Sequence, residues 1–144
     1  MNTPRPLSRR HFALAVFALG LAALIGLPSA SAADNPGQLY ATVVTQPGLT
    51  ASQVKDVVVR SLVARRWSVQ SQADDKVVGY LKHRSNEATL TLVYDAQKVE
   101  IYCSGWKIDK STGTRISPEL PERWLKNMRN DLTRRLNPAA AIAK

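Results

Sequence analysis

The pattern of hydrophobic and polar positions shows a helical period between Leu49 and Arg65. Apolar residues recur there three and four positions apart, as on the buried side of an amphipathic helix. Thr50 and Gln53 have the spacing of a capping box, which satisfies the first free N–H groups of a helix. We therefore predict a helix that begins after Thr50, and its many valines indicate that it depends on packing against a sheet.

The period changes from 3.6 to 2 between Arg66 and Ser104. Four alternating runs are separated by turn-forming clusters at residues 73–75, 85–86 and 95–96, which predicts an antiparallel meander. The positions expected to face the core are Trp67, Val69, Val77, Gly79, Leu81, Ala88, Leu90, Leu92, Tyr94, Val99, Ile101 and Cys103. The opposite face is more polar and is expected to contact solvent.

A second helical stripe lies near the C-terminus, after residues 105–117, whose glycines and hydroxyl residues predict a loop. The stripe consists of Trp124, Leu125, Met128, Leu132 and Leu136. Prolines at positions 118 and 121 suit the first turn of a helix, and Asn137-Pro138 predicts its end.

Together these elements predict one α+β domain at residues 49–136. It would have two layers, a four-stranded antiparallel meander sheet with two helices packed on one face, in the order α-β-β-β-β-α. Residues 33–48 contain two proline-glycine breakers around a short alternating stretch, and we expect a flexible lead-in or an edge strand. Residues 137–144 are expected to form a disordered tail.

The first 32 residues have the three parts of a secretory signal: an arginine-containing start, an apolar stretch from Phe12 to Leu27 and small residues ending at Ala32. We predict cleavage between Ala32 and Ala33. The apolar stretch spans 16 residues, fewer than the ~20 that a membrane-spanning helix needs. No cysteine follows it that could carry a lipid. The protein is therefore expected to be periplasmic or secreted, and not an integral membrane protein.

The basic start of this signal is compatible with two export routes. Residues 8–12, Ser-Arg-Arg-His-Phe, match the core of a twin-arginine signal, whose cargo is exported already folded. An ordinary Sec signal also needs a positively charged start, and the same arginines would supply it. The sequence does not distinguish the two routes.

The chain is strongly basic, with a formal net charge of +9. Removal of the first 32 residues leaves 17 basic and 11 acidic side chains, a net charge of +6. An exported protein meets anionic phospholipids and acidic envelope polymers rather than nucleic acid, so we expect no nucleic-acid partner. Simple solubility is the alternative explanation for a charge of this size.

Residue types that carry chemistry are scarce beyond the predicted signal. His83 is the only histidine and Cys103 the only cysteine there, which excludes a His/Cys metal cluster and an intramolecular disulfide. The alternating pattern places Cys103 on the apolar face, as a buried thiol. Glycine loops for phosphates, nucleophile elbows and calcium-loop spacings are absent. We therefore expect no cofactor, no metal and no enzymatic activity.

Two surfaces could bind a partner. On the polar face of the sheet, Tyr80, Lys82 and Tyr102 could meet a glycan or a peptide by stacking and hydrogen bonding, although tyrosine is also a good strand former. On the solvent side of the second helix, Arg123, Lys126 and Arg129 could lie against an anionic surface, or could simply be solvated.

Several short patterns resemble those of a group of small uncharacterised exported proteins and lipoproteins of proteobacteria. The patterns are Arg66-Trp67-x-Val69, Leu92-Val93-Tyr94-Asp95, Ile101-Tyr102-Cys103-Ser104 and Trp124-Leu125-x-x-Met128. The resemblance covers about residues 49–136 and implies a periplasmic helix–sheet–helix domain without an assigned activity. We expect a binding domain for an anionic envelope component, or, alternatively, an assembly accessory that binds a protein through its sheet face or edge strand.

Overall fold

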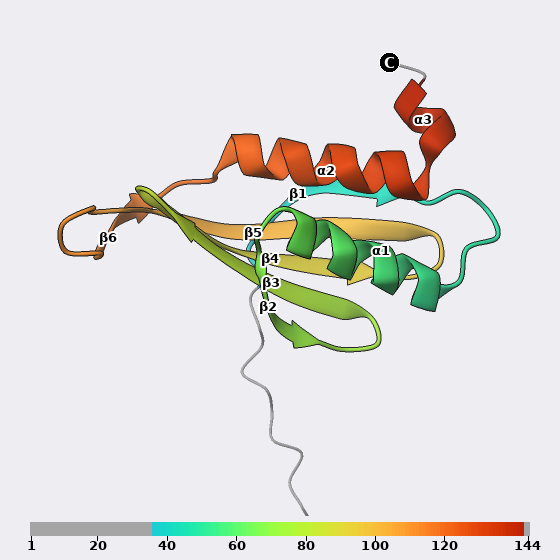
Figure 1. Ribbon diagram of the computed structural model, residues 1–144, viewed down its shortest axis with the longest axis horizontal. Coiled ribbons are helices and arrows are strands. Elements are labelled where there is room, and N and C mark those ends of the chain that lie inside the picture. The colour runs from blue at the N-terminus through green and yellow to red at the C-terminus, as the bar shows by residue number, and fades with distance from the viewer. Residues whose placement is uncertain (1–35, 143–144) are drawn as a thin grey trace, which may run out of the picture. The chain divides into compact units, whose positions relative to one another are not determined.

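The structure is a computed structural model and describes residues 36–142, so the predicted signal and its cleavage between Ala32 and Ala33 lie outside the described residues. The chain forms an α+β fold with one antiparallel sheet and three helices (Figure 1). The elements are β1 (Gln38–Val44), α1 (Ala51–Ala64), β2 (Ser68–Gln72), β3 (Lys76–His83), β4 (Asn86–Tyr94), β5 (Lys98–Ile108), β6 (Arg115–Pro118), α2 (Glu122–Leu136) and α3 (Pro138–Ile142).

Helix α1 begins where the capping pattern predicted. The Thr50 hydroxyl accepts a hydrogen bond from the Gln53 N–H at 3.2 Å, and Gln53 Oε1 accepts one from the Thr50 N–H at 2.9 Å. Such a cap stabilises a helix by about 1 kcal/mol. At the other end Arg66 has a φ of 63°, the left-handed conformation that commonly terminates a helix. The chain then turns directly into Trp67 and β2.

The central meander is confirmed, because strands β2 to β5 lie side by side in chain order. The register places Leu90 opposite both Gly79 and Cys103, so alternate positions on three strands share one face. All twelve positions expected to face the core do so: ten are buried, and Val69 and Leu81 are partly buried against the others.

The prediction of four strands is wrong, because the sheet has six. Residues 38–44, which the sequence left as a lead-in or an edge strand, form β1 and pair with residues 98–103 of β5. Residues 105–117 were expected to be a loop, but β5 continues to Ile108 and pairs there with β6. Both added strands lie on the same edge of β5. This pairing depends on contacts distant in sequence, which no local period reveals.

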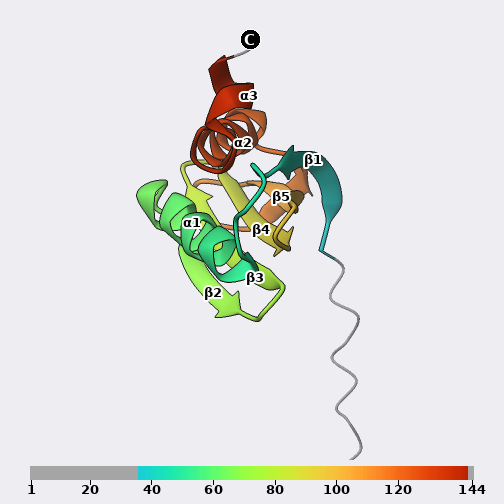
Figure 2. The same ribbon diagram turned by 90° about the vertical axis from the view of Figure 1, so that its right-hand side faces the viewer.

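Both long helices cover the same face of the sheet, as predicted (Figures 1 and 2). Helix α1 contacts β2, β3 and β4, whereas α2 contacts β1 and α1. Their buried residues join one core with the inward face of the sheet: Val54, Val58, Leu62, Leu125, Met128, Leu132 and Leu136.

The chain does not simply end after α2. Helix α2 stops at Leu136, as Asn137-Pro138 predicted, but residues 138–142, which were assigned to a disordered tail, form the short helix α3. Asn137 explains the restart, because its Oδ1 accepts a hydrogen bond from the Ala140 N–H at 3.1 Å and so caps the new helix.

Candidate binding surface

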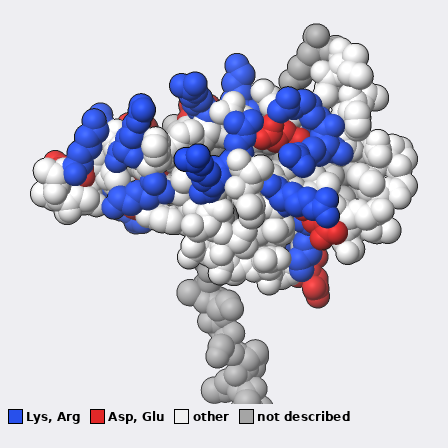
Figure 3. Space-filling view, in the orientation of Figure 1, with Lys and Arg blue, Asp and Glu red and all other residues white. Residues whose placement is uncertain are grey.

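The exposed side of α2 carries a row of cations. Arg123 and Lys126 are exposed, whereas Arg129 is half-buried and its Nε atom is buried without a hydrogen-bond partner among the described residues. Figure 3 shows Lys and Arg side chains gathered along α2. Within residues 36–142, the side chains of Arg123 and Lys126 make no hydrogen bond or ion pair. The predicted helix surface thus carries two exposed positive charges that no described residue pairs with.

The negative charge of Asp131 in α2 is balanced by ion pairs with two arginines. Asp131 is 7% exposed and accepts hydrogen bonds from Arg65 Nε at 2.5 Å and from the second Arg65 nitrogen, Nη2, at 3.0 Å. It also pairs with Arg134. The hydrogen bond from Arg65 is the main reason why the pKa of Asp131 lies below its usual range. This contact joins the end of α1 to α2 and leaves one net positive charge on the three side chains.

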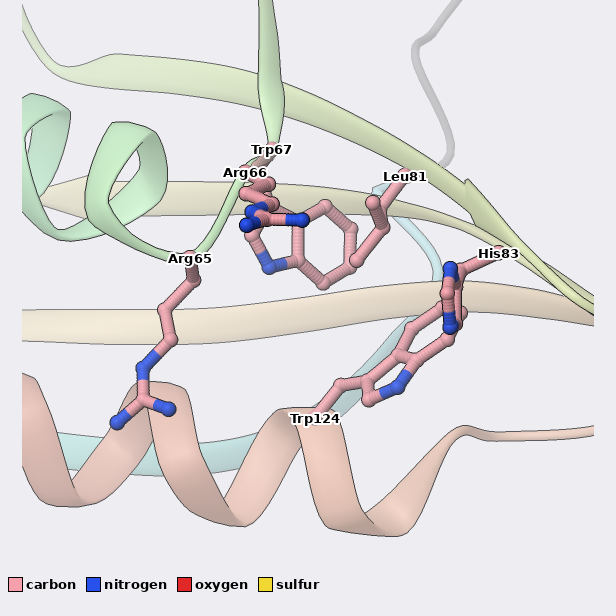
Figure 4. Close-up of a pocket in the computed structure, with 6 residues that line it drawn as sticks. All are labelled: Arg65, Arg66, Trp67, Leu81, His83 and Trp124. Atoms are coloured by element: carbon pink, nitrogen blue, oxygen red, sulfur yellow. The ribbon is translucent and has the colours of Figure 1, made fainter.

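A hollow of about 250 Å³ lies between the end of α1, the end of β3 and the start of α2 (Figure 4). It is lined by Arg65, Arg66, Trp67, Leu81, His83 and Trp124. The rings of Trp67 and Trp124 meet edge to face, with centroids 6.0 Å apart. Figure 4 shows Arg65 extending from the end of α1 toward α2. The hollow therefore combines an aromatic floor with a cationic rim.

A second, wider hollow of about 780 Å³ adjoins the first, because His83 and Trp124 line both. Its other walls are the β3–β4 turn, the chain leading into α2 and the first two turns of α2: Arg84, Ser85, Asn86, Glu119, Leu120, Pro121, Glu122, Arg123 and Asn127. We call the two hollows together the tryptophan groove. Arg123 belongs both to this groove and to the cationic row of α2, so the two features are continuous.

The residues predicted on the polar sheet face lie on that face, away from the cationic row of α2. Tyr80 and Tyr102 are half-buried on the face opposite the helices, and their hydroxyls donate hydrogen bonds of 3.1 Å to Glu87 and Glu100, respectively. Burial, together with Glu87, raises the pKa of Tyr80, and the bond to Glu100 raises that of Tyr102. Lys82 is exposed on the same face. The two predicted surfaces therefore lie on opposite sides of the sheet and do not form one site.

Sequence reasoning missed the charged cluster beside Tyr80. Glu87 is 7% exposed and forms an ion pair with Arg115 of β6, whose guanidinium lies 5.1 Å from the centroid of the Trp106 ring. The bond from Arg115 lowers the pKa of Glu87. No local pattern could reveal this cluster, because it depends on β6, which the sequence assigned to a loop. It holds the β5–β6 hairpin against the outer face of the sheet.

The described residues contain neither a cluster of metal-binding side chains nor a membrane-spanning helix. Between Pro36 and Ile142, no three His, Cys, Asp or Glu side chains come close enough together to hold a metal ion. None of α1, α2 and α3 has both the length and the apolar content needed to cross a membrane.

Cys103 is buried in the core, with 1% of its surface exposed, as the alternating pattern predicted. Burial, aided by the negative charge of Glu122, raises the pKa of its thiol to about 12. We expect the folded protein to react with a thiol reagent at least about a hundredfold more slowly than the unfolded protein, since the thiolate is the reactive form. Non-reducing electrophoresis should show a monomer; a disulfide-linked dimer would contradict the buried position.

Comparison of the chain with models of known protein families gives no match, and comparison with curated proteins gives none either. The resemblance to exported proteobacterial proteins therefore stays a prediction.

Proposed function

We propose that this protein is an exported, non-catalytic binding domain whose partner is an anionic component of the cell envelope. The observation that carries the proposal is the cationic row of α2, Arg123, Lys126 and Arg129. Two of these side chains are exposed and unpaired among the described residues. Arg135 adds an exposed cation at the last turn of the helix, whereas Arg134 is paired with Asp131. A row of this kind suits an extended anionic surface better than a small ion.

The positive charge of this row is expected to determine binding. Arg123→Gln/Lys126→Gln is expected to weaken binding to vesicles containing phosphatidylglycerol roughly thirtyfold at low salt, because each cation near an anionic surface contributes about 1 kcal/mol. The measurement is co-sedimentation across a salt series. Binding of the unchanged protein should fall steeply with salt, and zwitterionic vesicles should not sediment it.

The matched control is Lys55→Gln/Arg60→Gln, which removes two cations from α1. It should bind nearly as well as the unchanged protein if the row on α2 makes the contact. An equal loss in both double variants would show that net charge alone matters, and absence of binding at low salt would overturn the proposal.

An assembly accessory that binds a protein through an edge strand is the second candidate. Strand β1 stands at one end of the sheet order and carries Leu39 and Val44, which are 49% and 62% exposed. The opposite edge, β2, is shorter and more polar, features that disfavour added strands. Salt-insensitive association with one protein, abolished by a proline in β1, would favour this candidate.

A further inference from the structure

We infer that the tryptophan groove binds an anionic amphiphile: a phosphate group that carries an acyl chain, as in an anionic phospholipid. This inference rests on the proposed function and names the ligand class for it. It assigns the apolar chain to the floor of the smaller hollow and the phosphate to the arginines at its rim.

The floor suits a hydrocarbon chain. Trp67, Leu81 and Trp124 supply the apolar lining, and the edge-to-face packing of the two tryptophan rings fixes its shape. The hollow of about 250 Å³ is smaller than the ~300–1,000 Å³ typical of sites for whole small molecules. It therefore fits one short chain or the end of a longer one.

The rim suits a phosphate. Arg65, Arg66 and His83 are exposed there, and no carboxylate lines this smaller hollow. The Arg65 guanidinium is held in place by Asp131, whereas the Arg66 side chain makes no hydrogen bond or ion pair within residues 36–142. A planar guanidinium can bind two phosphate oxygens at once. Arg66 is thus the main candidate for the phosphate contact.

An acidic peptide fits this lining less well. A peptide backbone would bring polar groups against two indole rings and a leucine side chain, and would leave some of them without hydrogen bonds. An acyl chain has no such groups. The continuity of the groove with the cationic row through Arg123 would also let one lipid occupy the groove while α2 lies along a membrane surface.

The test uses the chain expressed from all 144 residues and purified in the form in which cells accumulate it. In a Trp106→Phe background the only tryptophans are Trp67 and Trp124, both in the groove. Monomeric dihexanoyl phosphatidylglycerol should shift their fluorescence to shorter wavelength and saturate. Dihexanoyl phosphatidylcholine, which lacks the net charge, and glycerol 3-phosphate, which lacks the chains, should each bind at least about tenfold more weakly.

Arg66→Asn tests the phosphate contact. Asparagine tolerates the positive φ of this position, so the charge is lost without strain on the backbone. We expect this variant to bind the phosphatidylglycerol about tenfold more weakly, while Arg60→Gln, which removes one cation from the exposed side of α1, binds it as before.

Equal binding of glycerol 3-phosphate and the acylated lipid would overturn the inference, and so would an unchanged affinity of Arg66→Asn. If the lipid leaves the fluorescence unchanged while the protein still sediments with anionic vesicles, the groove assignment fails and the proposed function stands. If neither occurs, both fail.

Discussion

Replacement of Gly105 by alanine is expected to lower the free energy of unfolding by about 3 kcal/mol, measured by urea denaturation. A Cβ atom at this position would lie 2.3 Å from the backbone oxygen of Glu119 and 2.9 Å from Pro121 Cδ. The Gly105 carbonyl also accepts a hydrogen bond of 3.0 Å from the Glu119 N–H. Overpacking and loss of this bond both destabilise the fold. The close approach sets the path of the chain into α2.

Gly79→Ala is the matched control, since Gly79 is also buried in the sheet. The nearest atom to its added Cβ would be Leu62 Cδ2, at 2.8 Å. A flexible side chain can move where a backbone carbonyl cannot, so we expect a loss of about 1 kcal/mol. A loss at Gly105 no larger than that at Gly79 would mean that residues 119–121 can shift, and that their position does not depend on β5.

The parts of the fold that could be predicted are those with a local cause. The capping pair Thr50 and Gln53 marked the start of α1, and the two-residue period identified β2 to β5 with the correct inward face. Strands β1 and β6 lacked such a cause. Residues 38–44 alternate only weakly between two breakers, and their strand is defined by backbone pairing with β5, distant in sequence. Pairing between strands that are distant in sequence leaves no recognisable hydrophobic pattern in a short stretch of residues.

The candidate site likewise has one part that could be predicted from the sequence and one part that could not. The row Arg123, Lys126 and Arg129 follows from helical spacing alone and could be predicted. The tryptophan groove could not be predicted, because Trp67 follows α1, Leu81 belongs to β3 and Trp124 to α2, and the three meet only after the helices pack. Trp67 was expected to face the core and Trp124 to belong to the stripe of the second helix; Trp67 is buried and Trp124 is partly buried against the core. The only signal in the local sequence was the pair of arginines, Arg65 and Arg66, at the end of the predicted helix. In the structure Arg66 has a left-handed backbone conformation and its side chain is exposed.

The contact between Asp131 and Arg65 leads to the second large effect. Asp131→Asn keeps the shape of the side chain but removes its charge, and we expect it to lower the free energy of unfolding by about 2 kcal/mol at pH 7. The loss is smaller than for a fully buried ion pair, since the Arg65 and Arg134 side chains are 39% and 65% exposed and solvent screens them. Urea denaturation at pH 7 measures the change.

The effect should disappear in acid. The pKa of Asp131 in the folded protein lies below the ordinary value of 3.8, first because of the hydrogen bond from Arg65. A group whose pKa is lowered by folding stabilises the protein fully above its unfolded pKa, and this contribution is lost as the pH falls through the folded pKa. The difference between the unchanged protein and Asp131→Asn should therefore be constant above about pH 5 and shrink steadily below pH 4.

Asp56→Asn, a change at an exposed position of α1 without an ion pair among the described residues, is the control and should alter stability little at any pH. The same Asp131 variant also separates stability from binding. Loss of the carboxylate frees two guanidiniums beside the cationic row and adds one positive charge, so a less stable protein should bind anionic vesicles more tightly, by about fivefold. Weaker binding by a variant that remains folded would mean that Asp131 is needed to hold Arg65 in position at the groove. The fixed positions of the arginine side chains would then matter more for binding than their number.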